Sequence, residues 1–404
     1  MATKVVSRKT LSKIVIVTSE AFPYGMAGTN RIISLAKGFI SNGVQAEVIS
    51  FYKYGVPGLG TPDPTHGCFE EIKFRNVFNS PNKSPYLIVR QIHELVKPYL
   101  VLLAGIKSIG KRNVVIYYAE KTWPAIALKM LSMVRKTVLL REETEHPGIR
   151  TINKGRIGRS LYIKVHYRLF DGLLVITQNL ADYFKVTLNY RKPILLVPML
   201  VDIDRFHKIG EEESQSIVFS GELDDRKEGV TVLIRAFSLI TNKYPELRLD
   251  LFGTAPEKSE ESQFYQLVET LDLKERVTFH GYKNRTFMTE ALGKARLFVF
   301  SRPPSLQAEF GFSTKLGEYL ATGKPVIVSQ VGEIGKYLTD GKDAYLCNPV
   351  PEAIAEKIVK IQEDYNVALT IGREGRNTSL KHFNNILRSE EPTSELQSRQ
   401  VISY

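Results

Sequence analysis

Residues Ser301–Gly323 read SRPPSLQAEFGFSTKLGEYLATG, and the strand-like run Pro325–Ser329 (PVIVS) follows almost directly. Gly311 breaks the loop, Ser313 or Thr314 can cap a helix that begins there, and Gly323 can end that helix. The stretch therefore predicts a short capped helix that leads into a buried strand. Loop, helix and strand in this order are typical of a parallel sheet flanked by helices.

The same alternation of strand and helix patterns runs along the whole chain. Short β-branched runs predict strands at Lys13–Thr18, Gln45–Ser50, Asn113–Tyr118, Lys136–Leu140, Gly172–Thr177, Ile194–Val197, Gln215–Ser220, Leu247–Phe252, Arg276–Phe279, Leu297–Phe300 and Pro325–Ser329. Helical patterns lie between most of them, for example at Thr29–Ser41, Val230–Thr241 and Ser313–Thr322. Two such series meet near Pro198–Gly210, which predicts an α/β protein with two Rossmann-like domains. The Gly- and Pro-rich segment Lys53–Pro85 is interpreted as an irregular insertion.

Composition limits the class of protein. The 404 residues carry a net charge of +12, of which residues 1–200 contribute +17 and residues 201–404 contribute −5. The basic half lacks clustered aromatic and basic strands, which argues against nucleic-acid binding. No apolar stretch approaches the roughly 20 residues that span a bilayer, and the start has no apolar core of a secretory signal. With two cysteines in different halves, we expect a cytoplasmic protein without disulfides.

The first predicted strand is followed by the loop SEAFPYGMAGTNR. Gly28 lets the backbone approach a ligand, and the helix that begins near Thr29 offers free N–H groups to an anion. This loop is not the GxGxxG fingerprint of dinucleotide enzymes. The alternative is a plain turn and helix cap.

The helix after Gly311 carries two charged residues of interest. Lys315 lies in the first turn, where a cation is unfavourable unless an anion is near, and Glu318 follows one turn deeper. A diphosphate at this helix start would leave Glu318 to accept hydrogen bonds from a ribose. The alternative is a capped helix with an exposed Glu318–Lys315 pair. Similarly, Arg226 and Lys227 in SGELDDRKEGV could neutralise a leaving diphosphate or form a solvated loop.

Two further charged segments lie in the first half. Glu142, Glu143 and Glu145 follow the fourth predicted strand, beside His146, and are candidates for binding acceptor hydroxyls. Their spacing fits no strong metal-ligand motif. The segment Arg150–Arg168 holds six basic residues and no acidic residue, with apolar residues between them. It suits a helix on an anionic membrane surface or an ordinary solvated helix.

Taken in order, these segments resemble the retaining glycosyltransferases of family 4, over roughly Lys13–Leu387. The resemblance lies in FPYGMAGTNR, LLVPMLVDIDRF, SGELDDRKEGV, LDLFG, GFSTKLGEYLATGKPVIVS and GEIGKYLTDG. It implies the GT-B fold, in which two Rossmann-like β/α/β domains face a central cleft. The expected parts are an acceptor-binding domain at 1–198, a donor-binding domain at 199–368 and a helix at 369–387 that crosses back. Residues 388–404 include RSEEPTSELQSR, which resembles a translated sequencing adaptor, and are interpreted as an artefactual tail.

The resemblance also implies roles for individual residues. Glu318 matches the glutamate that binds the donor ribose, and Lys227 matches the lysine that holds the diphosphate. Phe310 stands where the family has its first glutamate, with Glu309 one position away, and Glu222 replaces the usual arginine, for which Arg226 could substitute. The predicted catalytic residues are Lys227, Glu318 and Arg226. The predicted donor-binding residues are Gly253, Tyr282, Glu309, Gly311, Ser313, Thr314, Lys315 and Glu318, and the predicted acceptor-binding residues are Gly28, Thr29, Asn30, Glu120, Glu142 and Glu143.

The expected function is metal-independent, retaining transfer of a hexosyl group from a nucleoside-diphosphate sugar to a carbohydrate or lipid-linked acceptor, in cell-envelope or polysaccharide synthesis. No cofactor is expected besides the nucleotide-sugar co-substrate, and no nucleic-acid partner. An anionic membrane surface contacted through Arg150–Arg168 would place the protein on the inner face of the membrane. The alternatives are a nucleotide-sugar processing enzyme of the epimerase kind on the same fold, and a non-catalytic basic protein that binds membrane surfaces.

Overall fold

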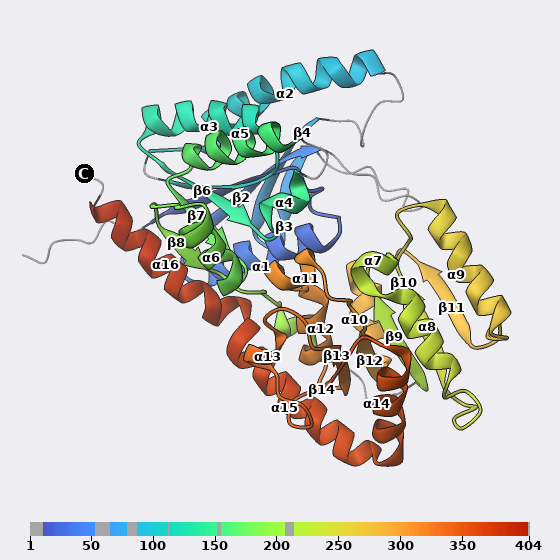
Figure 1. The fold of residues 1–404 in the computed structure, drawn as a ribbon. Helices are drawn as coiled ribbons and strands as arrows, with labels where there is room; N and C mark the ends of the chain where they lie inside the picture. The colour runs from blue at the N-terminus through green and yellow to red at the C-terminus, as the bar shows by residue number, and fades with distance from the viewer. Residues whose placement is uncertain are drawn as a thin grey trace, which may run out of the picture. The chain divides into compact units, whose positions relative to one another are not determined.

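The computed structural model describes residues 11–52, 65–78, 87–111, 113–151, 155–206 and 214–402. The chain divides into two compact units (Figure 1). The first unit comprises Met1–Leu200 with Asn385–Tyr404, and the second comprises Val201–Asn384. Each unit is built around its own sheet, so each is described by itself.

The first unit contains an eight-stranded sheet in the order β3-β4-β2-β1-β5-β6-β7-β8. The strand pairs are parallel, apart from the antiparallel hairpin of β3 and β4. The strands are β1 (Lys13–Thr18), β2 (Gln45–Tyr52), β3 (His66–Phe69), β4 (Ile72–Phe78), β5 (Val114–Tyr118), β6 (Val138–Glu143), β7 (Gly172–Val175) and β8 (Ile194–Leu196). The central strands are buried on both faces, which explains their nearly continuous apolar sequences.

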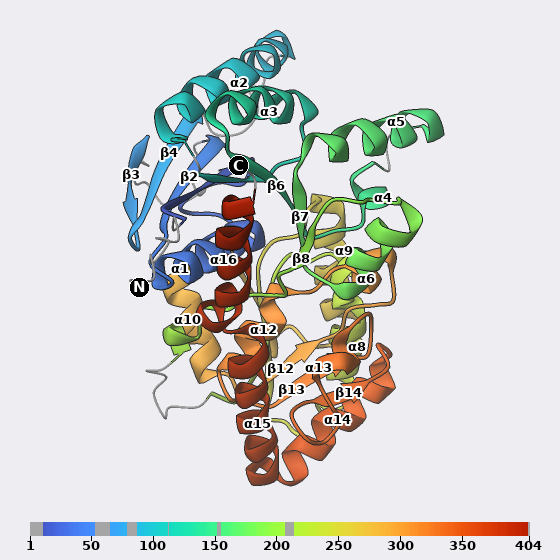
Figure 2. The ribbon, with the colours of Figure 1, turned by 90° about the vertical axis from the view of Figure 1, so that its left-hand side faces the viewer.

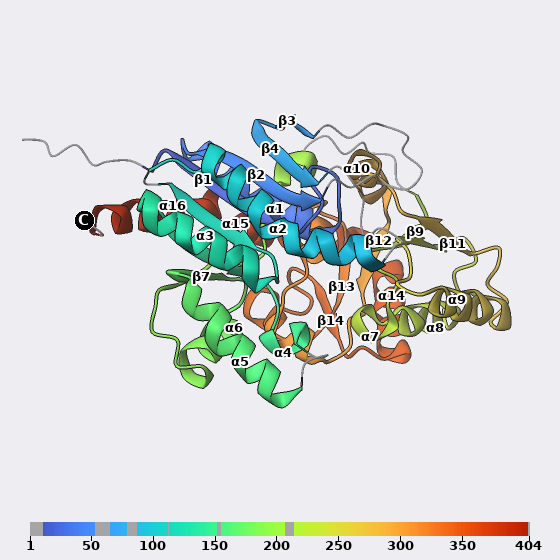
Figure 3. The same ribbon diagram turned by 90° about the horizontal axis from the view of Figure 1, so that it is seen from above.

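Helices cover both faces of this sheet. Helix α1 (Ala27–Ser41) packs on one face in a core with Ile14, Ile16 and Leu396. Helices α2 (Leu87–Ser108) and α3 (Thr122–Arg135) lie side by side over the other face, above a core that includes Val15 and Tyr117 (Figure 3). The remaining helices of the first unit are α4 (Pro147–Arg150), α5 (Arg156–His166), the short helix η1 (Tyr167–Leu169), α6 (Gln178–Asp182), η2 (Tyr183–Thr187) and α16 (Asn385–Ile402).

The second unit contains a six-stranded parallel sheet in the order β11-β10-β9-β12-β13-β14. Its strands are β9 (Ser216–Ser220), β10 (Arg248–Phe252), β11 (Val277–Gly281), β12 (Leu297–Phe300), β13 (Val326–Ser329) and β14 (Tyr345–Cys347). Its helices are η3 (Ile203–Phe206), α7 (Asp225–Glu228), α8 (Val230–Ser238), α9 (Lys258–Thr270), α10 (Arg285–Lys294), α11 (Leu306–Phe310), α12 (Thr314–Ala321), α13 (Ile334–Tyr337), α14 (Pro351–Glu363) and α15 (Tyr365–Phe383).

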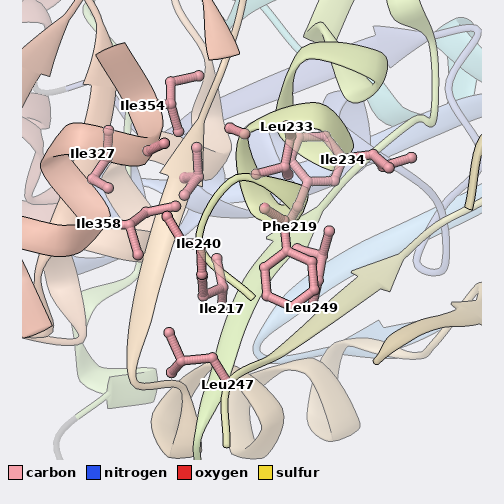
Figure 4. Close-up of a cluster of buried hydrophobic side chains, with 14 of the residues drawn as sticks. Ile217, Phe219, Leu233, Ile234, Ile240, Leu247, Leu249, Ile327, Ile354 and Ile358 are labelled. Carbon is pink, nitrogen blue, oxygen red and sulfur yellow. The ribbon is translucent and has the colours of Figure 1, made fainter. Parts of the chain in front are cut away.

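The core of the second unit lies between this sheet and helices α8, α9 and α14. Figure 4 shows Ile217, Phe219 and Leu249 of the strands together with Leu233 of α8 and Ile358 of α14. On the opposite face Tyr319 of α12 stacks on Phe298 of β12, with ring centroids 4.4 Å apart. This packing fixes α12 against the sheet at the place where the predicted site lies.

Each predicted strand is present, with ends that differ by three residues at most. The prediction of an irregular insertion over Lys53–Pro85 is wrong for residues 66–78, which form β3 and β4. Other parts of that insertion, residues 53–64 and 79–85, lie outside the described residues. Among the described residues, no helix combines the length and the apolar character needed to cross a membrane.

Residues 388–402 of the predicted artefactual tail lie within α16, which packs along α1 (Figure 2), and residues 403–404 lie outside the described residues. Ser389 and Leu396 are buried there, and a Cβ built on Gly38 of α1 would lie 1.9 Å from Ser389 Oγ. Gly38 therefore allows the two helices to approach closely. The structure thus gives Ser389 and Leu396 of this segment a packed position, and the artefactual origin of the segment stays a prediction.

Candidate functional site

The strand order of each sheet predicts one position at which a ligand would bind. In open α/β sheets, ligands bind beyond the carboxyl ends of the strands where the strand order reverses. In the second unit this position lies between β9 and β12, and in the first unit it lies between β1 and β5. The residues that follow these four strands are therefore candidates for ligand binding.

The loops after β9 and β10 touch each other through two glycines. Gly253 has a φ of +131°, and a Cβ at this position would lie 1.7 Å from the carbonyl oxygen of Gly221. Gly221 in turn donates its N–H to the oxygen of Phe252 at 2.8 Å. A side chain on Gly253 would push the two loops apart, so this residue contributes backbone shape at the predicted donor site. Tyr282 follows β11 at the same edge of the sheet and is half-buried.

A buried cluster of charges lies beside Gly221, and we call Glu228, Arg302 and Lys315 the Glu228 cluster. The Glu228 carboxylate is buried and lies 2.8 Å from Arg302 Nη2 and 2.9 Å from Lys315 Nζ. A Cβ built on Gly221 would lie 2.2 Å from Lys315 Nζ. The end of Lys315 therefore lies directly under the loop that follows β9.

This cluster holds more positive than negative charge. Burial alone would raise the pKa of Glu228, but the charges of Lys315 and Arg302 outweigh burial and hold that pKa below its usual range. Burial also lowers the pKa of Lys315 to about 8, against the attraction of Glu228. Two cations on one carboxylate leave one net positive charge in a desolvated place, which is suited to attract an anion.

The N-terminus of α12 lies next to this cluster. Ser313 is the N-cap residue of the helix, and its side chain makes no capping hydrogen bond. Gly311, Ser313 and Arg302 line one small pocket together with Glu333 of the following loop. The first N–H groups of α12, from Thr314 onward, have no capping side chain, as anion binding at a helix start requires. Glu309 of α11 is exposed and does not line this pocket.

Glu318 lies one turn further along α12. Its Oε1 accepts a hydrogen bond from Arg205 Nη1 at 2.7 Å. Arg205 comes from η3 and also donates to Thr289 Oγ1 at 2.9 Å, which fixes its guanidinium. The exposed Glu318–Lys315 pair considered from the sequence is absent, because Lys315 pairs with Glu228 and Glu318 pairs with Arg205.

Lys227 and Arg226 lie on α7, which follows the loop after β9. Asp224 caps this short helix by accepting the N–H of Lys227 at 3.0 Å. The Lys227 ammonium lies 3.2 Å from Glu222, and the side chain of Arg226 is exposed. The sequence pointed to Lys227 as the main cation of this site. In the structure, the buried cation is Lys315.

In the first unit, Glu20 and Glu120 follow the two strands at the reversal of strand order. A Cβ built on Gly28 would lie 2.6 Å from Glu20 Oε2, so the loop glycine and this carboxyl group are in contact. Burial raises the pKa of Glu20, and the nearby Glu120 and Glu145 add to the shift. Thr29 is buried and donates to the oxygen of Ala21 at 2.6 Å, while Asn30 is half-buried.

Glu142 and Glu143 lie deeper than we expected, in buried ion pairs with arginines. Glu142 Oε1 accepts from Arg31 Nε at 2.6 Å. Glu143 lies 3.2 Å from Arg141 Nε and 2.9 Å from Arg150 Nε, and it accepts the Tyr167 hydroxyl at 2.7 Å. Glu143 is thus held by three side chains of the protein, whereas Glu142 is held through Oε1 alone, and a role of either in acceptor binding stays a prediction. Glu120 is exposed, with its Oε1 3.5 Å from Arg150 Nη1.

Sequence reasoning missed four of these residues: Glu20, Arg205, Glu228 and Arg302. Glu20 and Arg302 could have been found, because each directly follows a strand at a reversal of strand order. Glu228 and Arg205 could not have been found in this way, because their roles depend on ion pairs with residues far away in the sequence. Among the described residues, no group of three or more His, Cys, Asp or Glu side chains could hold a metal ion.

Comparison with known proteins shows similarity to one family and to several distant relatives. Residues 214–364 match the family described as glycosyl transferases group 1. The mannosylfructose-phosphate synthase of Agrobacterium fabrum is 27% identical over 213 residues, which is 48% of this chain and 45% of that protein. The chain thus spans about half the length of the curated relatives it matches.

Solved structures match along almost the whole chain. Sucrose-phosphate synthase of Thermosynechococcus elongatus has a TM-score of 0.72 at 16% identity and covers 97% of this chain and 99% of its own. HepE of Anabaena, in complex with UDP and glucose, has a TM-score of 0.70 at 16% identity and covers 96% of this chain and 100% of its own. These matches confirm the predicted fold: the chain has the GT-B fold, and its residues 214–364 are similar to the glycosyl transferases group 1 family.

Proposed function

We propose that the chain is a retaining glycosyltransferase that moves a hexosyl group from a nucleoside-diphosphate sugar to a carbohydrate or lipid-linked acceptor. The observation that carries this proposal is the Glu228 cluster beside the uncapped N-terminus of α12. A buried net positive charge and free N–H groups at one sheet edge suit a diphosphate. The glycosyl transferases group 1 match covers the same elements.

On the donor side, each residue has a distinct proposed role. Lys315 and the N–H groups that follow Ser313 and Thr314 would neutralise the charge that develops on the leaving diphosphate. Glu318 would accept hydrogen bonds from the ribose. The remaining proposed donor contacts are Gly253, Tyr282, Glu309, Gly311, Arg226 and Lys227. With these cations supplied by the protein, we propose transfer without a metal or cofactor, with attack on the face from which the diphosphate leaves.

On the acceptor side, the proposal rests on the edge of the first sheet. Gly28, Thr29, Asn30 and Glu120 were predicted to bind the acceptor, and Glu20 joins them because its carboxyl group touches Gly28. A carboxyl group near the surface can bind sugar hydroxyls by accepting their hydrogen bonds. We assign this role to Glu20 and Glu120 in place of the buried Glu142 and Glu143.

We further propose a role in cell-envelope or polysaccharide synthesis at the inner face of the membrane. Helix α5 supports membrane contact because Lys164 and Ile157 are exposed on it. Arg150 does not belong to that surface, since Glu143 holds its guanidinium at 2.9 Å. The proposed contact is therefore restricted to α5 and Arg168, which is also exposed.

A panel of UDP-, GDP- and ADP-sugars tests the proposed activity. We expect the protein to release the diphosphate from one sugar nucleotide, and more rapidly when an acceptor is present. Chromatography of the nucleotides would measure it. No release from any donor would contradict the proposal, and conversion of the sugar nucleotide into a new one without an acceptor would favour the epimerase-like alternative.

The low pKa of Lys315 predicts how nucleotide binding depends on pH. Folding lowers the pKa of Lys315 from 10.5 to about 8, so at neutral pH its buried charge destabilises the folded state. As the pH rises from about 8 to 10.5, the folded protein loses this proton first, and the free energy of unfolding increases. Above pH 8 the ammonium is lost, so we expect the dissociation constant for UDP to rise about tenfold between pH 7 and pH 9. Isothermal titration calorimetry measures this. Lys315→Met should bind UDP weakly with no such slope, and an equal slope in both proteins would contradict the assignment.

A further inference from the structure

Helix α2 exposes a row of apolar side chains that no part of the described chain covers. Tyr99 and Leu103 keep 68% and 56% of their surface exposed. The exposed members of the row are Ile92, Val96, Tyr99, Leu103 and Ile106. Their spacing of four and three residues places them on one face of the helix.

Helix α3 carries a second exposed apolar row. Trp123 and Val134 are 73% and 78% exposed. Met130 and Met133, which lie between them in the sequence, are 66% and 69% exposed. The two helices pack closely because Gly105 of α2 lies against Leu128 and Leu131 of α3. The rows therefore lie on neighbouring helices of one layer (Figures 1 and 3), and we call them together the α2–α3 face. Soluble monomers rarely expose so many large apolar side chains on adjoining elements.

The charge around this face is strongly one-sided. In the sequence, residues 92–136, which span both rows, contain two acidic residues, Glu94 and Glu120. The same stretch contains eight basic residues: Lys97, Lys107, Lys111, Arg112, Lys121, Lys129, Arg135 and Lys136. Lys107 and Lys111 are exposed at the end of α2 and beyond it. An apolar face flanked by basic residues is complementary to a lipid surface, because the basic side chains can bind anionic headgroups while the apolar side chains enter the acyl region.

We infer that the α2–α3 face docks the protein on an anionic lipid bilayer. The charge disfavours a second copy of this chain, because a two-fold interface would bring the basic residues of both copies together. Tyr99 and Trp123 add side chains that are favourable at the boundary between lipid headgroups and acyl chains. The inference extends the proposed membrane contact from α5 to a larger surface. It rests on the proposed function in one respect, because a lipid-linked acceptor would lie in the same bilayer.

Trp123 makes the inference directly measurable, because it is the only tryptophan in the chain. Vesicles of phosphatidylcholine with about one third phosphatidylglycerol should shift its emission to shorter wavelength and carry the protein into the pellet on sedimentation. Pure phosphatidylcholine vesicles should bind much less, and molar salt should weaken binding to the anionic vesicles.

Two triple variants separate this face from general surface hydrophobicity. Leu103→Gln, Met130→Gln and Val134→Gln together should weaken vesicle binding at least about tenfold, since three exposed apolar groups no longer enter the lipid. The matched control replaces Leu239, Val350 and Val367 by Gln, which are exposed apolar residues of the second unit, and should bind like the wild type.

Three results would overturn the inference: no emission shift with anionic vesicles, equal binding by the α2–α3 variant and the wild type, or an equal loss in the control variant. Sedimentation velocity without lipid should give the same mass for the wild type and the α2–α3 variant. A dimer that the variant alone disrupts, with vesicle binding unchanged, would assign the face to a second copy. Diphosphate release from a sugar nucleotide needs no vesicles, so its failure would count against the proposed activity and not against docking.

Discussion

Replacing Glu318 by Ala is expected to lower kcat/KM for the nucleotide sugar by about 100-fold or more. The wild-type carboxylate is oriented by Arg205, which donates to Oε1 at 2.7 Å. Among the described residues Oε2 has no hydrogen-bond partner, so it is available to a ribose. Hydrogen bonds to a charged acceptor contribute about 1.5–3 kcal/mol each, and a ribose diol can make two of them. Steady-state kinetics on the donor identified by the panel would measure the loss.

A second variant distinguishes ribose binding from a simple effect on Arg205. Glu318→Ala also leaves the Arg205 guanidinium without its carboxylate, and an unpaired cation at this edge could itself disturb the site. The double variant Glu318→Ala with Arg205→Met removes that cation. If Glu318 binds the ribose, the double variant stays as inactive as the single one. Recovery of activity in the double variant would show that the loss came from Arg205.

Most strands could be predicted from the sequence because they are short apolar runs, and the central ones, such as β1, β7, β12 and β13, are buried along almost their whole length. The two strands missed within Lys53–Pro85, β3 and β4, are of another kind. They form an antiparallel hairpin at the edge of the sheet, and β3 (HGCF) is largely exposed. A short exposed edge strand such as β3 has little apolar signal, so its sequence cannot be told from that of a loop. Strand β4 (IKFRNVF) lies between β3 and β2 and buries Ile72 and Phe74, so its alternating pattern was a signal that could have been used.

The residue types of the site could be predicted, but not their partners. Lys315 lies in the first helical turn, where a cation is unfavourable unless a negative charge is near it. Glu228 of the protein itself supplies a negative charge 2.9 Å from the Lys315 ammonium. No local sequence pattern connects Glu228 to α12. Likewise, Arg205 and Glu318 are 113 residues apart. Such pairs depend on how the strands are ordered in the sheet, which local periodicity does not contain.

Glu143→Ala is expected to destabilise the first unit by about 3–5 kcal/mol, the usual cost of breaking a buried ion pair from one side. Arg141 and Glu143 are fully buried, and Arg150 is nearly so. Without the carboxylate, two buried guanidinium groups and the Tyr167 hydroxyl lose their common partner. Urea unfolding followed by far-ultraviolet circular dichroism would report this loss, because Trp123, the only tryptophan, is already 73% exposed in the folded state.

Glu120→Gln is the matched control, because Glu120 is exposed and lies 3.5 Å from the same Arg150. Its unfolding free energy should change by less than about 0.5 kcal/mol, as is usual for exposed pairs, whereas its KM for the acceptor should rise if Glu120 binds acceptor hydroxyls. Glu143→Ala should show the opposite pattern at a temperature where it remains folded, with lower stability and an unchanged acceptor KM. A raised acceptor KM with wild-type stability would instead return Glu143 to the acceptor site, because a carboxylate that serves only to pair buried arginines cannot be removed without a loss of folding free energy.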